Sequence, residues 1–250
     1  MSAYLDNNIL IEIEENKYSI EKIKNQLNIE FEISFYSQAH IYEAIEMKTS
    51  NEQLDFKNLS RRFDEISSIT NNMYLMFDIK NNRVCKKKIE PKLIFDTISD
   101  AGYVLSMIKS FVNLIENEKK VEFRKENNLD SKRINNLKPY EVIMHLEKKT
   151  NIFQGESFMD QLLKIYDNKL LTKEQRNLYC TTITFEFLDL IGYWKDKVNS
   201  KSNYARLWDS NHAFFASFCQ FFISNDFRTR NKTKVVYELL GVNTVIHSMS

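Results

Sequence analysis

Glycine and proline are scarce in this chain, which has four Gly and two Pro in 250 residues. Tight turns depend on these two residue types, so an all-β protein with many short turns is disfavoured. The 18 Phe and 12 Tyr provide ample material for a packed core and argue against disorder. We therefore expect long helices combined with a modest sheet.

Short apolar segments alternate with helical patterns at both ends of the chain. The first fifty residues predict strands at 3–5 and 31–36, and helices after residue 8, near 19–27 and from Ser37 onward. The last fifty residues predict a helix over 209–220, a strand at 221–224, a basic helix over 229–240 and a strand at 242–246. This alternation is typical of a parallel α/β sheet.

The middle of the chain has a different pattern. Apolar segments at 73–79 and 83–89 flank Lys80-Asn81-Asn82 and predict a β-hairpin. Helical patterns surround it, at about 52–70, 97–120, 139–149, 157–168 and 173–197. The predicted organisation is therefore an α/β core formed by residues 1–50 and 201–250, with a large, mainly helical insertion over 51–200 that contains the hairpin at 73–89.

Four acidic residues fall close to predicted strand ends. Asp6 and Asp226 each follow a strand, Glu43 lies within two helical turns of the second strand, and Asp209 precedes the helix before the strand at 221–224. Ligands of open parallel sheets bind beyond the carboxyl ends of the strands. Four carboxylates at one edge would repel one another unless a cation neutralised them, and Mg²⁺ or Mn²⁺ prefers such oxygen ligands. The sequence therefore predicts a divalent-metal site.

Each acid also has a structural interpretation. Asp6 and Asp209 are suitable helix N-caps, and any of the four acids can be an ordinary surface carboxylate. Glu46 is a near-equal alternative to Glu43 as the second acid of the cluster. The order and spacing of the four together favour a shared site.

These motifs resemble those of the PIN-domain nuclease family. Residues 4–10 (Tyr-Leu-Asp-Asn-Asn-Ile-Leu) are similar to its first motif, an apolar strand ending in Asp. Residues 37–44 look like the second motif, in which Glu follows a strand-end Ser by six positions. Residues 209–226 resemble the closing block, and 241–246 resemble the last strand. The chain departs from the family in its long insertion and in the aromatic helix after Asp209.

The resemblance implies a PIN-like parallel sheet flanked by helices and a metal-dependent endoribonuclease. Asp6, Glu43, Asp209 and Asp226 would hold one or two Mg²⁺ or Mn²⁺ ions, and Asn8 would orient one of the metal-binding groups. The metal would activate a water and stabilise the leaving oxygen, giving a 5′ phosphate and a 3′ hydroxyl. Toxin, defence and RNA-processing roles in a prokaryote all fit, and the family also implies homodimerisation.

Residues beside the acids are candidates for supporting roles. His212 lies three residues after Asp209, on the same helix face, and is either a neighbour of the metal site or a hydrogen-bonded structural histidine. Arg228, Arg230 and Lys232 follow Asp226 and are predicted to contact substrate phosphates, with a solvated helix start as the alternative.

Net charge, cysteine content and the motifs that are missing exclude several other classes of protein and of site. The net charge of +1 offers no general attraction for polyanions, so any nucleic-acid site is local. The three widely spaced cysteines form no CxxC pair, which disfavours a disulfide framework or a zinc site and favours a reducing compartment. No apolar run approaches the roughly 18 residues of a membrane span, so we expect a cytoplasmic protein without a membrane partner. GxxxxGK[ST], GxGxxG, HExxH and GxSxG motifs are all missing.

Two alternatives to an endoribonuclease remain open. One is a nuclease acting on single-stranded or flap DNA, because nothing in the sequence reads a 2′-hydroxyl. The other is a non-catalytic PIN-like interaction protein, in which residues 51–200 bind a partner or inhibitor protein. The presence of all four acids argues against the second alternative.

Overall fold

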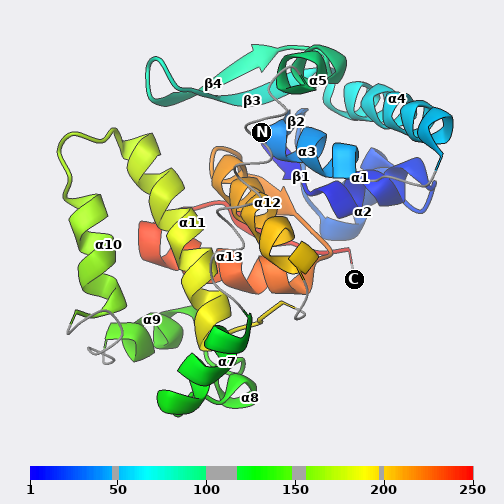
Figure 1. The fold of residues 1–250 in the computed structure, drawn as a ribbon. Helices are drawn as coiled ribbons and strands as arrows, with labels where there is room; N and C mark the ends of the chain where they lie inside the picture. The colour runs from blue at the N-terminus through cyan, green and yellow to red at the C-terminus, as the bar shows by residue number, and fades with distance from the viewer. Residues whose placement is uncertain (47–50, 100–116, 148–155, 197–199, 250) are drawn as a thin grey trace.

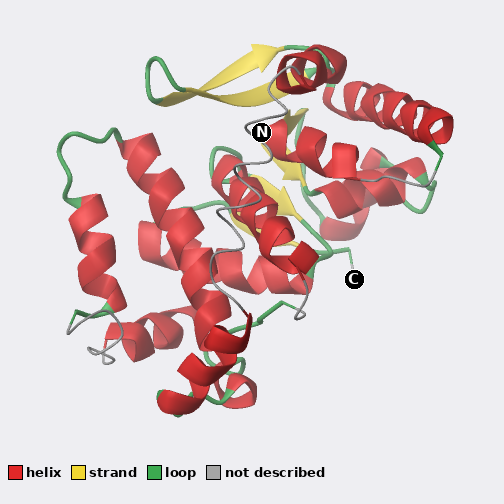
Figure 2. Cartoon of the chain, in the orientation of Figure 1, coloured by secondary structure: helices red, strands yellow, loops and turns green. Residues whose placement is uncertain are grey.

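A six-stranded mixed sheet forms the centre of the computed structural model, which describes residues 1–46, 51–99, 117–147, 156–196 and 200–249 (Figures 1 and 2). The strand order is β4-β3-β2-β1-β5-β6. The strands are β1 (Ser2–Leu5), β2 (Ile33–Ser37), β3 (Met73–Asp78), β4 (Arg83–Lys88), β5 (Phe221–Ile223) and β6 (Val245–His247). All neighbouring strands are parallel except β3 and β4. The α/β class is confirmed. The prediction of a parallel sheet is only partly correct, because the pairing of β3 with β4 makes the sheet mixed.

Helices flank this sheet, and most of them lie where helical periodicity predicts them. They are α1 (Asn7–Glu14), α2 (Ile20–Leu27), α3 (Gln38–Glu46), α4 (Glu52–Thr70), α5 (Pro91–Ser99), α7 (Asn117–Glu126), α8 (Ser131–Ile134), α9 (Pro139–Glu147), α10 (Phe158–Tyr166), α11 (Lys173–Ile191), α12 (Ser200–Ala216) and α13 (Phe227–Leu240). The middle of the helix predicted at 97–120 lies outside the described residues. Local signals define several ends: Thr172 and Gln175 form a capping box at the start of α11, and Gly241 ends α13 with φ +62°.

The start of α12 differs from the prediction. We expected this helix to begin at Asp209, but it already begins at Ser200, so Asp209 lies inside the helix and is not its N-cap. Asp6, in contrast, does cap a helix: its side chain accepts a hydrogen bond from the backbone N–H of Asn7 at the start of α1. Asp226 caps α13 in the same way.

The predicted hairpin is confirmed, and it extends the central sheet. β3 and β4 pair antiparallel from Met73↔Lys88 to Asp78↔Arg83. β3 also pairs parallel with β2, where Tyr36 lies opposite Tyr74. The hairpin therefore shares one sheet with the strands from both ends of the chain. The division into a core and an insertion stays a prediction.

Alternating residues of β1 face two different cores. Ala3 and Leu5 pack into the cluster that includes residues of α1, α2 and α4, whereas Tyr4 packs with Phe214 and Phe222 on the side of α12. A strand buried on both faces is expected for the middle of a helix-covered parallel sheet. β1 thus lies between the two helical layers and contributes side chains to both of their cores.

A further apolar core lies among the helices away from the hairpin. α7 to α10 gather around α11 in Figure 1. Phe158 of α10 stacks on Phe187 of α11 with ring centroids 4.0 Å apart, and Val235 of α13 joins the same cluster. None of the described helices has the length and apolar character needed to cross a membrane.

Candidate functional site

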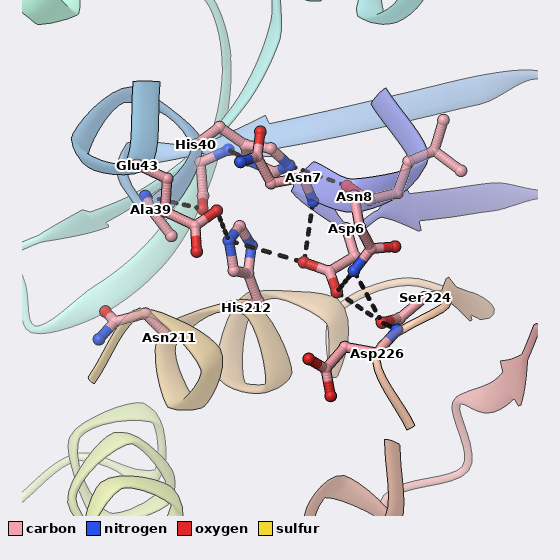
Figure 3. A network of polar contacts seen from close by, with 12 residues as sticks. Asp6, Asn7, Asn8, Ala39, His40, Glu43, Asn211, His212, Ser224 and Asp226 are labelled. Carbon is pink, nitrogen blue, oxygen red and sulfur yellow. Dashed lines mark hydrogen bonds and ion pairs between the residues drawn. The ribbon is translucent and has the colours of Figure 1, made fainter. Parts of the chain in front are cut away.

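The strand order brings the predicted acids to one edge of the sheet. β1 lies between β2 and β5, and Leu5 is opposite Ile223, so Asp6 and Asp226 follow adjacent strand ends. β2 ends at Ser37 on the other side of β1 and leads into α3, which carries Glu43. α12 packs against α3 and adds His212 and Asp209. Figure 3 shows His212 between Glu43 and Asp6, with Asp226 below Asp6 in this view.

Asp6 is buried, and a set of donors fixes its carboxylate. Its Oδ1 accepts from the backbone N–H of Asn7 at 2.8 Å, while Oδ2 accepts from Asn8 Nδ2 at 2.6 Å and from Ser224 Oγ at 2.5 Å. The side-chain oxygen of Asn8 also accepts from the backbone N–H of Asn225 at 2.9 Å. Asn8 and Ser224 therefore tie the end of β1 to the end of β5 and fix the orientation of Asp6.

Burial raises the pKa of Asp6, and neighbouring charges modify the effect. His212 and the Ser224 hydroxyl counteract the rise, whereas the carboxylates of Glu43 and Asp226 add to it. Such a combination of burial and like charges is common at functional sites. The Asp6 carboxylate is thus held in a place that disfavours its negative charge.

His212 supplies the positive charge at the centre of this site. Its Nε2 donates to Glu43 Oε2 at 3.0 Å and lies 3.7 Å from Asp6 Oδ1. Burial alone would lower the pKa of His212, but the carboxylates of Glu43, Asp6 and Asp209 raise it to about 9. His212 is therefore an imidazolium at neutral pH, and its Nδ1–H donates to the Tyr4 hydroxyl at 2.8 Å.

Tyr4 and His40 form the buried support of His212. The Tyr4 hydroxyl lies 2.6 Å from Ser37 Oγ. His40 Nδ1 accepts from the Ser37 backbone N–H at 3.0 Å, and its Nε2–H donates to the Leu5 carbonyl at 2.8 Å. Burial and the nearby His212 charge lower the pKa of His40 well below its ordinary value, which keeps this ring neutral. The two histidines, although adjacent, therefore carry different charges.

Asp209 lies on α12, one turn before His212, and is partly buried. No hydrogen bond or ion pair joins its carboxylate to another of the described residues. Burial raises its pKa well above the ordinary value, and the carboxylates of Asp226, Glu43, Asp196 and Asp6 add to the rise. Asp209 is thus the acid of this cluster whose charge is least compensated.

Asp226 and Glu43 occupy the two sides of the cluster. Asp226 Oδ1 accepts from the backbone N–H groups of Arg228 and Thr229 at 2.7 and 2.9 Å. Glu43 contacts His212, whereas Glu46, its alternative in the sequence, is exposed at the end of α3. The geometry therefore favours Glu43 as the acid that belongs to the cluster.

The chemistry of these donors suits a divalent cation, but their present spacing does not. Within the described ranges, no three His, Cys, Asp or Glu side chains are grouped closely enough to hold a metal ion. The cluster nevertheless combines four carboxylates with an Asp209 side chain that lacks a partner among the described residues. Hard divalent ions take such oxygen ligands. Burial, reinforced by repulsion between the acids, raises the pKa values of Asp6 and Asp209, and a bound metal would relieve the repulsion.

Two arginines follow Asp226 at the start of α13. Arg230 donates from a terminal guanidinium nitrogen to the Ser224 carbonyl at 2.6 Å. Burial lowers its pKa, and the carboxylates of Asp226 and Asp6 counteract this. Arg228 is partly exposed, and its backbone N–H donates to Asp226. Arg230 therefore lies at the edge of the acidic cluster, and Arg228 is tied to that edge through its backbone.

Lys232 lies away from the acidic cluster, which corrects its predicted role as a phosphate contact. Its side chain is buried, with Nζ 3.1 Å from Asp196 and 3.9 Å from Asp189. Arg206, also buried, lies 2.9 Å from the Asp196 carboxylate and 3.0 Å from that of Asp189. Lys120 adds a contact of 3.0 Å to Asp189. Lys232 therefore belongs to a buried ion network that joins α7, α11, α12 and α13, and it is not available to a substrate.

The sequence patterns assigned no site role to Tyr4, Ser37 or Ser224, although Ser37 is the strand-end Ser of the second motif. Tyr4 reads as an ordinary apolar strand residue, and its hydroxyl has no neighbour in the sequence that would suggest a buried partner. Ser224 stands two residues before Asp226, inside the motif quoted above, and this spacing was the available signal.

Comparisons of the chain with models of protein families, with characterised proteins and with solved structures find no match. The case for a function therefore rests on the geometry and charge of the site and on the resemblance of its sequence motifs.

Proposed function

We propose that the chain is a metal-dependent nuclease that hydrolyses phosphodiester bonds in RNA. The observation that carries this proposal is the acidic cluster. Asp6, Glu43, Asp209 and Asp226 come from separate segments, and burial together with mutual repulsion raises the pKa of Asp6 and Asp209. Mg²⁺ or Mn²⁺ bound by these four residues would neutralise the excess negative charge.

In such an enzyme, different residues of the site would have different roles in hydrolysis. A bound metal supplies a water of lowered pKa, which is the nucleophile for hydrolysis at neutral pH. Asn8 and Ser224 hold the Asp6 carboxylate in a fixed orientation. Arg228 and Arg230, at the edge of the cluster, provide positive charge for the phosphate of the substrate.

The resemblance to PIN-domain nucleases supports RNA as the substrate and a PIN-like core as the fold. It also supports a cytoplasmic protein with a toxin, defence or RNA-processing role. DNA, as a single strand or a flap, is the alternative substrate. The same enzymatic site would serve either polymer, so a direct comparison of the two polymers decides.

A non-catalytic interaction protein is the second candidate function. It is favoured by His212, whose positive charge already neutralises part of the cluster without a metal. In that case the acids would remain as a structural network, and metal ions would change neither stability nor activity.

The test is cleavage of labelled RNA and single-stranded DNA by the purified protein with Mg²⁺, with Mn²⁺ and with EDTA. Asp6→Asn and Asp226→Asn are the informative variants, because Asn is also a good N-cap and preserves the starts of α1 and α13. Glu238→Gln, on the exposed side of α13, is the matched control.

We expect metal-dependent RNA cleavage in the wild type and in Glu238→Gln, and loss of cleavage in both Asn variants with their folding intact. Cleavage of DNA but not of RNA would make DNA the substrate. No cleavage of either polymer, combined with no rise in melting temperature on adding metal, would reject the nuclease in favour of the interaction protein.

A further inference from the structure

An aromatic residue precedes two of the acids, and the two rings stack on each other. Tyr42 of α3 comes directly before Glu43, and Trp208 of α12 comes directly before Asp209. Their ring centroids are 4.2 Å apart and their planes differ by 16°. The pair lies one turn of α12, about 5.4 Å along the helix axis, from the contact between Glu43 and His212.

Of the two rings, Tyr42 is the more accessible to solvent. Trp208 is 3% exposed and covers one face of the Tyr42 ring, while Tyr42 itself is only partly buried. Tyr42 therefore supplies most of the accessible surface of this pair. Because Tyr42 directly precedes Glu43, this surface belongs to the helix that brings Glu43 to the acidic cluster.

A second aromatic pair borders the cluster at Asp226. Phe227 follows Asp226 directly and is 47% exposed, although it is a fully apolar side chain. Its ring meets Trp194 edge to face with centroids 4.3 Å apart. Trp194 has φ +43°, a left-handed conformation that bulky residues rarely adopt. Backbone strain of this kind persists where the surrounding structure enforces it, and it concentrates at ligand sites.

The two pairs share one arrangement. Each has a partly accessible aromatic residue directly before or after an acid of the cluster in the chain, and a tryptophan from another segment contacts its ring. Aromatic faces bind nucleobases by stacking, and they do so with little regard to sequence because every base has a π-face. Bases inside a duplex are already stacked and paired, so they are not available to such rings.

We propose that the Tyr42–Trp208 and Phe227–Trp194 pairs are stacking platforms for unpaired nucleobases on either side of the phosphate at the acidic cluster. The substrate is accordingly a single strand or an unpaired loop. The position of the phosphate rests on the proposed nuclease function, but stacking itself requires neither metal nor cleavage. The two proposals can therefore be tested separately.

The experiment measures binding of a short, fluorescently labelled single-stranded RNA by anisotropy, in EDTA so that no metal-dependent cleavage occurs. Tyr42→Ala and Phe227→Ala remove the exposed rings and leave both tryptophans in place. Tyr42→Phe and Phe227→Tyr are the matched controls, because they retain the aromatic face. Tyr140→Ala is the control for a general loss of exposed aromatic surface, since Tyr140 of α9 is also 47% exposed.

Each alanine variant is expected to weaken binding of the single strand by roughly 5- to 150-fold, the range found for stacking of one base. The aromatic variants and Tyr140→Ala should stay within about twofold of the wild type, and circular dichroism melting verifies folding. The same RNA annealed to its complement should bind equally to wild type and alanine variants.

Unchanged binding of the single strand by both folded alanine variants would overturn the platforms, as would an equal loss in the aromatic variants. RNA cleavage by Tyr42→Ala and Phe227→Ala at the wild-type rate and KM would also overturn them, while leaving the nuclease intact. Conversely, loss of binding in the alanine variants together with a wild type that cleaves nothing would support the base-binding site and reject the nuclease.

Discussion

Replacing Asp209 with Asn should stabilise the metal-free protein. The Asp209 carboxylate is partly buried, is repelled by other acids and has no hydrogen-bond or ion-pair partner among the described residues. Leaving a fully buried polar group unsatisfied costs on the order of 1–3 kcal/mol, and a partly buried carboxylate such as that of Asp209 falls at the lower end, about 1 kcal/mol. Because 1 kcal/mol shifts the Tm of a chain of this size by about 2–4 °C, we expect Asp209→Asn to melt by about that much above the wild type near neutral pH in EDTA.

The gain should depend on pH in a defined direction. The pKa of Asp209 is raised in the folded state, so the folded protein holds this proton more tightly than the unfolded chain. The wild type therefore loses stability as the pH rises above about 4, the ordinary pKa of an unfolded Asp. The difference between Asp209→Asn and wild type should be small near that pH and should grow toward neutral pH.

Asp196→Asn is the matched control, with the opposite sign. Asp196 is a nearby acid whose carboxylate is paired with Arg206 at 2.9 Å and with Lys232 at 3.1 Å. Its neutralisation removes the nearest carboxylate of the buried Lys232 and one of those that pair with Arg206, and breaking a buried ion pair costs up to about 3 kcal/mol. Thermal melts of both variants and wild type at acidic and neutral pH complete the assay. A lower Tm for Asp209→Asn at neutral pH, or a gain independent of pH, would contradict an uncompensated charge at Asp209.

Three further changes have defined outcomes. His212→Gln should destabilise the protein most below the ordinary His pKa of about 6.5, and urea unfolding should show the loss disappearing as the pH rises through about 9, the pKa of His212; a loss that persists in more alkaline solution would argue against a charge effect. Lys232→Met should lower the urea midpoint because Asp196 loses a cation, and an unchanged midpoint would contradict the ion network. Gly192→Ala should cost more than Gly241→Ala in the same assay: both glycines have positive φ, but only at Gly192 would the new methyl group meet α8; equal losses would contradict this packing.

The acids at strand ends could be predicted because their position follows from local patterns. Asp6 and Asp226 each terminate a short apolar strand, and parallel strands bring their carboxyl ends to one edge of the sheet. That β1 and β5 are immediate neighbours, however, depends on pairing across more than 200 residues. The sequence patterns therefore predicted which side chains to examine but not which pairs of them touch.

Lys232 and Tyr4 show why other assignments failed. Lys232 follows Asp226 in a basic run, and its burial depends on acids contributed by residues 189 and 196 far away in the chain. Tyr4 looks apolar in its strand, yet its hydroxyl contacts Ser37 and His212 from two other elements. Similarly, the early start of α12 at Ser200 has no strong local signal. In each case long-range contacts decide the outcome.

The buried ion network limits how the protein can be shortened. Arg206 and Lys232 lie on α12 and α13, but the carboxylates that neutralise them, Asp189 and Asp196, belong to the middle of the chain. Removing the whole segment would also open Arg206 and Lys232 to water, which can solvate both charges. A shorter deletion that kept α11 but lost Asp196 would instead leave the buried Lys232 with only the more distant carboxylate of Asp189, so the network has to be kept or removed as a unit.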